Sequence, residues 1–110
     1  MSLDIALYSD PECRNQIASF NITHNLNKMA TEACIYEPLW RPEEVWPDAR
    51  AADLEPLLRE AIPEIIRNRW EYAKFDAPNG WGTVDDFIRF IREVHSACVA
   101  YPTSYIRAYR

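Results

Sequence analysis

A polar segment in the first quarter of the chain carries side chains suited to holding a ligand. Four of the five residues in the Asn-Ile-Thr-His-Asn run at 21–25 form hydrogen bonds readily. We expect this run to join a strand to a helix, where unpaired N–H groups attract anions. His24 and Lys28 are one helical turn apart and can add positive charge. The alternative is that Asn21 and Thr23 only cap the helix. The candidate binding residues here are Asn21, Thr23, His24, Asn25 and Lys28.

His95 is the other candidate for proton transfer. Helical spacing places it near the apolar stripe that contains Ile91 and Cys98. A core histidine held by one or two hydrogen bonds is the simpler interpretation. The functional interpretation is an acid–base residue that shares a pocket with His24, and burial would lower its pKa.

A glycine-flanked tryptophan marks a third candidate. The Pro-Asn-Gly-Trp-Gly run at 78–82 permits unusual backbone angles and close approach of another chain. Trp81 either folds back onto the core or stays exposed as an interface anchor. Asn79 and Trp81 therefore join the candidate binding residues.

Motifs for established chemistries are missing from the sequence. We find no phosphate-binding glycine loop, nucleophile-elbow serine, zinc spacing or calcium loop. The three cysteines (Cys13, Cys34 and Cys98) have no metal-ligand spacing, and we expect inert thiols in a reducing compartment. We therefore expect no cofactor, no metal and no catalytic residues, with His24 and His95 as the catalytic alternative.

The charge balance narrows the choice of partner. The 110 residues include 12 basic and 17 acidic side chains, for a net charge of −5. No clustered basic surface is visible, which disfavours nucleic acid as a partner. No run of residues has the length and apolarity of a membrane span or leader. We expect a cytoplasmic protein that binds a protein partner or a small anionic ligand.

Residue patterns predict one α+β domain over residues 1–110. Alternation of Leu3, Ile5 and Leu7 is typical of a strand, and the segment 36–47, with three prolines, is expected to be irregular. Pro63 should kink or divide the second helix, whose signal fades over 70–75. The expected elements are strands over 3–8, 15–20 and 104–109, a helix over 23–35, a helix capped by Asp53, and a helix capped by Thr83 and ended by Pro102.

These elements predict a three-stranded, largely antiparallel sheet with about three helices packed on one face. The N-terminal hairpin supplies two strands and the C-terminal segment supplies the third. An exposed edge on so short a sheet would also make a homo-oligomer easy to form.

The order of the Asn-Ile-Thr-His-Asn run at 21–25, the segment from Tyr36 to Pro42 and the Ala-Pro-Asn-Gly-Trp-Gly-Thr run at 77–83 resembles a family of small uncharacterised bacteriophage and bacterial proteins. The resemblance covers most of the chain after Phe20 and implies a phage or prophage accessory protein of unknown activity. The leading hypothesis is a non-enzymatic binding module. The alternative is a small hydrolase or lyase that uses His24 and His95 as acid and base.

Overall fold

The computed structural model describes residues 2–78, 80 and 82–110. Two 3₁₀ turns (η1 and η2) accompany the helices and strands. In chain order the elements are β1 (Ser2–Tyr8), β2 (Gln16–Thr23), η1 (His24–Leu26), α1 (Asn27–Glu32), α2 (Tyr36–Trp40), α3 (Pro42–Val45), α4 (Ala51–Arg67), α5 (Arg69–Tyr72), η2 (Ala73–Phe75), α6 (Val84–Ala100) and β3 (Tyr105–Tyr109).

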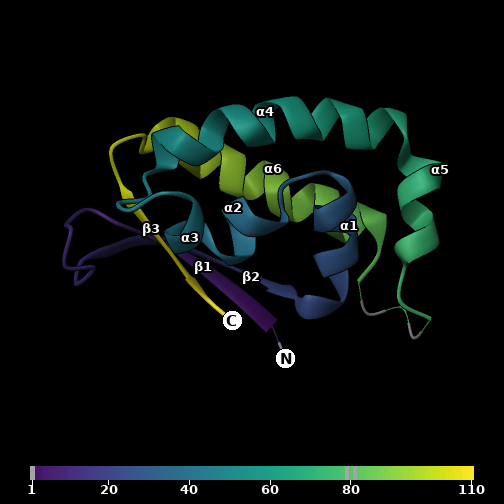
Figure 1. The fold of residues 1–110 in the computed structure, drawn as a ribbon, viewed down its shortest axis with the longest axis horizontal. Helices are drawn as coiled ribbons and strands as arrows, with labels where there is room; N and C mark the ends of the chain where they lie inside the picture. The colour runs from purple at the N-terminus through teal and green to yellow at the C-terminus, as the bar shows by residue number, and fades with distance from the viewer. Residues whose placement is uncertain (1, 79, 81) are drawn as a thin grey trace.

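The three strands form an antiparallel sheet, as the sequence predicted, and the structure gives their order as β2-β1-β3. The alternating apolar residues of β1 are fully buried and face the helices. The strand register places Ile5 between Phe20 of β2 and Ala108 of β3. The outer face of the same sheet has no helix over it in Figure 1.

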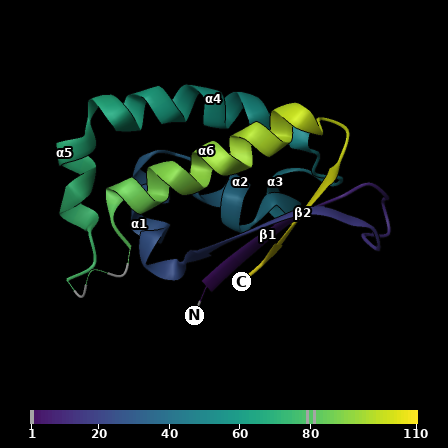
Figure 2. The same cartoon turned by 180° about the vertical axis from the view of Figure 1, so that it is seen from behind.

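The helices form two layers above the sheet (Figures 1 and 2). α6 lies against β2, while α4 packs on the side of α6 that faces away from the sheet. α1 packs against α2, and α2 in turn contacts β3. The expected count of about three helices was too low, because the described residues contain six α-helices.

The start of α6 follows the predicted cap. The Thr83 hydroxyl accepts a hydrogen bond from the Asp86 N–H at 3.2 Å, and Asp86 accepts one from the Thr83 N–H at 3.1 Å. Most of the predicted apolar stripe of this helix is buried: Val84, Phe87, Ile88, Ile91, Val94 and Cys98. Tyr101, also assigned to the stripe, follows the end of the helix and is exposed.

The start of α4 differs from the prediction, and Pro63, which was expected to kink or divide this helix, does not divide it. It begins at Ala51, and Asp53 lies in its first turn, where its carboxylate accepts the Arg50 N–H at 3.0 Å. The helix continues past Pro63 to Arg67. Pro63 and Arg59, whose carbonyl loses its helical donor, both lie on the exposed side, so water can satisfy that carbonyl.

Two segments expected to be irregular are helical instead. The segment 36–47 contains α2 and α3, and the segment 69–75 contains α5 and η2. Proline begins α3 and lies early in α2, where a missing N–H costs little. Trp40 is buried to 1% exposure and fixes α2 onto the core.

Candidate functional site

A groove of about 430 Å³ lies beside the end of β2 and joins two parts of the chain that are far apart in sequence. One wall comes from η1 and the start of α1, and the other comes from η2 and the residues after it. Its lining residues are His24, Asn25, Asn27, Lys28, Lys74, Phe75, Asp76, Ala77 and Pro78.

Both lysines of the chain line this groove. The sequence contains only Lys28 and Lys74, and one comes from each wall. Lys74 also forms an ion pair with Glu71 at 2.8 Å, between two exposed side chains. That contact lowers the pKa of Glu71 and raises the pKa of Lys74. The groove therefore has a cationic side chain on each wall.

The carboxylate of Asp76, which lines the groove, takes part in a hydrogen bond within the fold. Asp76 Oδ1 accepts a hydrogen bond from the Val84 N–H at 2.9 Å, at the start of α6. This bond satisfies one of the free N–H groups of that helix and directs the negative charge toward it. Phe75, Ala77 and Pro78 add an apolar section to the same wall.

His24 is fixed by a tryptophan. Trp40 Nε1 donates a hydrogen bond to His24 Nδ1 at 3.0 Å, and the two ring centroids are 6.4 Å apart. Because Nδ1 accepts, the neutral ring carries its proton on Nε2. Nε2 is buried and has no hydrogen-bond partner among the residues that the structure describes.

Gly82, the last residue of the predicted turn, lies against Thr23 of the predicted junction. A Cβ placed on Gly82 would meet Thr23 Cγ2 at 3.0 Å and Leu26 Cδ2 at 3.2 Å. Gly82 also has a φ of +111°, which favours glycine. The two candidate segments therefore contact each other. Asn79 and Trp81 lie outside the described residues.

The structure places Asn21 and Thr23 apart from this groove. Both belong to β2, so the expected helix over 23–35 begins later, with η1. Asn21 Nδ2 donates to Asp4 Oδ1 at 2.6 Å across the sheet, and Thr23 Oγ1 accepts from the Asn25 N–H at 3.3 Å. Thr23 is therefore a cap, and Asn21 is a cross-strand partner.

His95 has a partner of its own. Its Nε2 lies 2.8 Å from Glu55 Oε2 of α4, and both side chains are mostly buried. This agrees with a core histidine held by a hydrogen bond. Cys98, one turn further along α6, is fully buried, and burial raises the pKa of its thiol to about 12. At neutral pH the thiol stays protonated and is a poor nucleophile.

The sequence did not reveal the second wall of the groove. Lys74 and Phe75 lie in a segment where the helical pattern of the sequence fades, and no spacing rule connects them with Lys28. The scarcity of lysine was a visible signal, but only the fold shows that the two lysines share a groove.

Comparisons with protein-family models, curated protein sequences and solved structures found nothing that matches this chain. The described residues contain no group of three or more His, Cys, Asp or Glu side chains placed to hold a metal ion. Within the same residues, no helix has the length and apolarity needed to cross a bilayer. The fold and the groove are therefore the basis for a functional proposal.

Proposed function

We propose that this protein is a non-enzymatic binding protein whose groove between η1 and η2 holds a small anionic ligand. The ligand class is a carboxylate- or phosphate-bearing molecule with an apolar portion. Lys28 and Lys74 would contact the anionic group, and Phe75 and Pro78 would contact the apolar portion.

The position of the two lysines carries this proposal. In a chain of net charge −5, the only two lysines line one groove, on opposite walls. An ammonium group has three donors and a flexible stem, so two of them can close on one anion. One acid, Asp76, also lines the groove, and its carboxylate accepts a hydrogen bond from the Val84 N–H at the start of α6.

A hydrolase or lyase that uses His24 and His95 together is the alternative proposal. It requires both imidazoles in one pocket. Each ring instead has a separate partner on a separate element, Trp40 for His24 and Glu55 for His95. No observation favours joint action of the two rings, so we give preference to the binding protein.

The biological setting stays a prediction. The resemblance to small phage and bacterial proteins suggests an accessory protein of a phage or prophage in a bacterial cytoplasm. A groove for a small anion is compatible with that setting and does not depend on it.

An NMR titration tests the binding proposal. Inorganic phosphate and benzoate are added separately to ¹⁵N-labelled protein, and amide shifts are followed residue by residue. We expect benzoate to move amides on both walls of the groove, with a smaller response to phosphate. Lys28→Gln and Lys74→Gln should each weaken benzoate binding by roughly tenfold, because each removes one charged donor.

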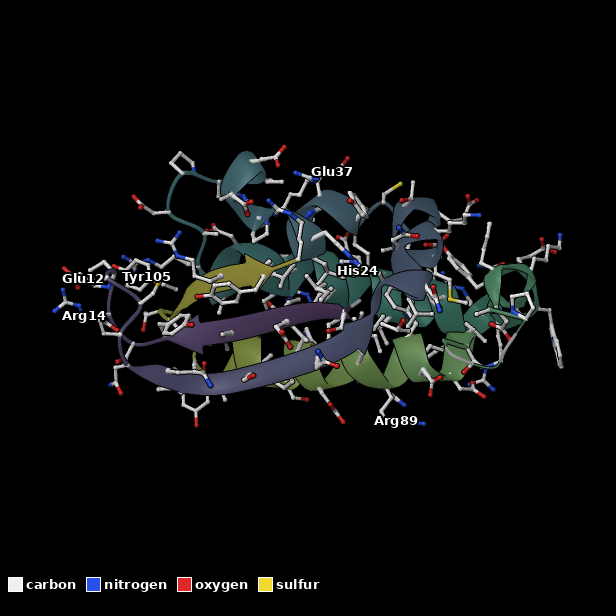
Figure 3. All side chains as sticks on the ribbon, turned by 90° about the horizontal axis from the view of Figure 1, so that it is seen from below. Glu12, Arg14, His24, Glu37, Arg89 and Tyr105 are labelled. Carbon is white, nitrogen blue, oxygen red and sulfur yellow. The ribbon has the colours of Figure 1, made fainter. Side chains whose placement is uncertain are left out.

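Arg14→Gln is the matched control. Arg14 lies at the tip of the β1–β2 hairpin, far from His24 in Figure 3, and its substitution makes the same change in charge. If Arg14→Gln and Lys28→Gln weaken benzoate binding equally, the effect comes from net charge alone, and the proposal is overturned. Shifts confined to other parts of the molecule would also overturn it.

A further inference from the structure

β2 forms one end of the sheet, with a long edge that has no neighbouring strand. The strand order β2-β1-β3 gives β2 one strand neighbour, and the strand runs over eight residues. Its sequence, Gln-Ile-Ala-Ser-Phe-Asn-Ile-Thr, contains no charged residue and no proline. Edge strands are usually protected by charges, prolines or covering segments, because their free N–H and C=O groups pair readily with another strand.

α6 lies along this edge and leaves a groove beside it. Figure 3 shows the sheet from below, with α6 running beside β2 and Arg89 directed away from the sheet. The groove has a volume of about 760 Å³, and a second hollow of about 260 Å³ continues along the same line. The large groove is lined from β2 by Phe20 and mainly from α6 by residues that include Ile88, Arg92, Glu93 and Ala97.

The inward side chains of β2 are only half covered. Ala18, Phe20 and Ile22 pair with buried residues of β1 and pack against the core, yet each stays partly exposed. A fourth strand beside β2 would place its own inward side chains in the groove under α6. Such a strand needs apolar residues on the inward face and polar residues on the outward face.

We propose that the fourth strand is β2 of a second copy of this chain, paired antiparallel across a two-fold axis. β2 has the required pattern, with Ala18, Phe20 and Ile22 inward and Ser19 and Asn21 outward. Antiparallel pairing of identical strands is self-complementary and closes after two copies. The product is a continuous six-stranded sheet.

Charge also favours a second copy at this edge. Each chain has a net charge of −5, so two copies repel across most of their surfaces. β2 is uncharged, and the adjacent face of α6 carries both signs, in Arg89 and Arg92 beside Asp85 and Glu93. Two copies can therefore meet here without like-charge repulsion along the strand.

The two-fold axis has a favoured position at Phe20. With Phe20 opposite Phe20 of the second copy, Ala18 faces Ile22 and Ser19 faces Asn21, which keeps inward residues opposite inward ones. Cross-strand aromatic pairs are stabilising in this arrangement. Strand pairing alone buries less area than a standard interface of roughly 1,200–2,000 Å², so we expect a reversible dimer of modest affinity.

Sedimentation velocity of the full chain over a wide concentration range tests the proposal. We expect a reversible dimer with twice the mass of the 12.9 kDa chain. Ala18→Lys should raise the dimer dissociation constant by at least ~tenfold, because the ammonium reaches water past a free edge but not under a second strand. Ser19→Lys, on the outward face, provides a second variant that does not touch the core.

Val45→Lys is the matched control. Val45 is exposed on α3, which packs against β3 at the opposite edge of the sheet. This substitution adds the same charge, and the dimer should persist. Circular dichroism confirms the fold of each variant. Ser19→Lys keeps its ammonium in water on the outward face and should weaken the dimer less than Ala18→Lys does. A monomer at every concentration overturns the proposal, and so does a dimer that Ala18→Lys and Val45→Lys affect equally.

Discussion

The two edge strands of the sheet differ in how well their edges are protected. β3 is short, and the segment before α4 closes it: the Ile106 N–H donates to Ala49 O at 2.9 Å, and Arg50 bridges to Tyr105. β2 is longer and uncharged, and it borders an open groove. One sheet therefore has a sealed edge and an open edge.

Arginine side chains reinforce the sealed edge. The Arg50 guanidinium lies 4.1 Å from the centroid of the Tyr105 ring and also donates a hydrogen bond to its hydroxyl. Arg110 contacts Glu43 of α3 at 2.7 Å and the Trp40 carbonyl at 2.8 Å. Backbone hydrogen bonds and arginine contacts therefore protect the β3 edge, whereas the β2 edge remains available to a partner.

The largest contrast between the edges should appear on truncating one inward isoleucine in each strand. Ile106 of β3 is buried to 4% exposure, whereas Ile22 of β2 is half-buried. We expect Ile106→Ala to lower the free energy of unfolding by about 2–4 kcal/mol and Ile22→Ala by about half as much. Urea denaturation at low protein concentration measures both, and equal losses would contradict the contrast.

The next effect concerns the arginine that seals β3. Arg50→Ala removes the ring contact and hydrogen bond to Tyr105, and we expect a loss of about 1–2 kcal/mol in unfolding free energy. Arg59→Ala is the control, because Arg59 is exposed on α4 with a 3.7 Å ion pair to Glu55, and it should change stability by less than ~0.5 kcal/mol. A similar loss in both variants would mean that Arg50 contributes nothing beyond a surface charge.

A tyrosine pair on the uncovered face of the sheet links β1 to the sealed edge. The hydroxyls of Tyr8 and Tyr109 are 2.8 Å apart, and this hydrogen bond together with burial raises the pKa of Tyr8 to about 12. Because folding favours the neutral phenol, its stabilising contribution is complete below the ordinary pKa of 10.0 and is lost as the pH rises through the folded pKa.

Tyr109→Phe should therefore lower the Tyr8 pKa toward its ordinary value and reduce stability at neutral pH by less than about 1 kcal/mol. Alkaline titration of tyrosinate absorbance measures the pKa. Tyr101→Phe, at an exposed site at the end of α6, should leave the Tyr8 titration unchanged. An unchanged Tyr8 titration in Tyr109→Phe would show that the hydroxyl contact is not made in solution.

The smallest effect is expected at the chain terminus. Partial burial raises the pKa of Glu43, but the hydrogen bond from Arg110, a backbone hydrogen bond and the charges of Arg110 and Arg41 together outweigh it and lower the pKa overall. Glu43→Gln should cost less than ~0.5 kcal/mol, because both side chains are well exposed. The contribution is present above the ordinary pKa of 4.5 and is lost as the pH falls through the folded value. The free energy of unfolding is measured against pH for the unchanged chain and for Glu43→Gln. The two curves should converge at low pH, and parallel curves would contradict the ion pair.

Local sequence patterns were sufficient to predict the strands of the sheet and α6. Alternation in β1, the capping residues Thr83 and Asp86, and the stripe of α6 each depend on neighbours within a few residues, so the sequence displays them directly. The same reading failed for α2, α3 and α5, which are short and gain their stability by packing on the core rather than from their own propensity.

The candidate site was predictable only in part. His24, Asn25 and Lys28 do lie together, since one turn of chain separates them. Asn21 was assigned to the junction as well, but β2 extends further than its apolar pattern suggested and turns Asn21 toward Asp4.

The sequence by itself determined the α+β class, the hairpin, the capped final helix and a polar junction at the end of β2. Only the tertiary structure decided that Lys74 and Lys28 line one groove, that Glu55 holds His95, and that β3 is sealed while β2 borders an open groove. The reason is physical: periodicity and capping are set by residues near in sequence, whereas each of these pairings joins segments brought together by burial of a common core.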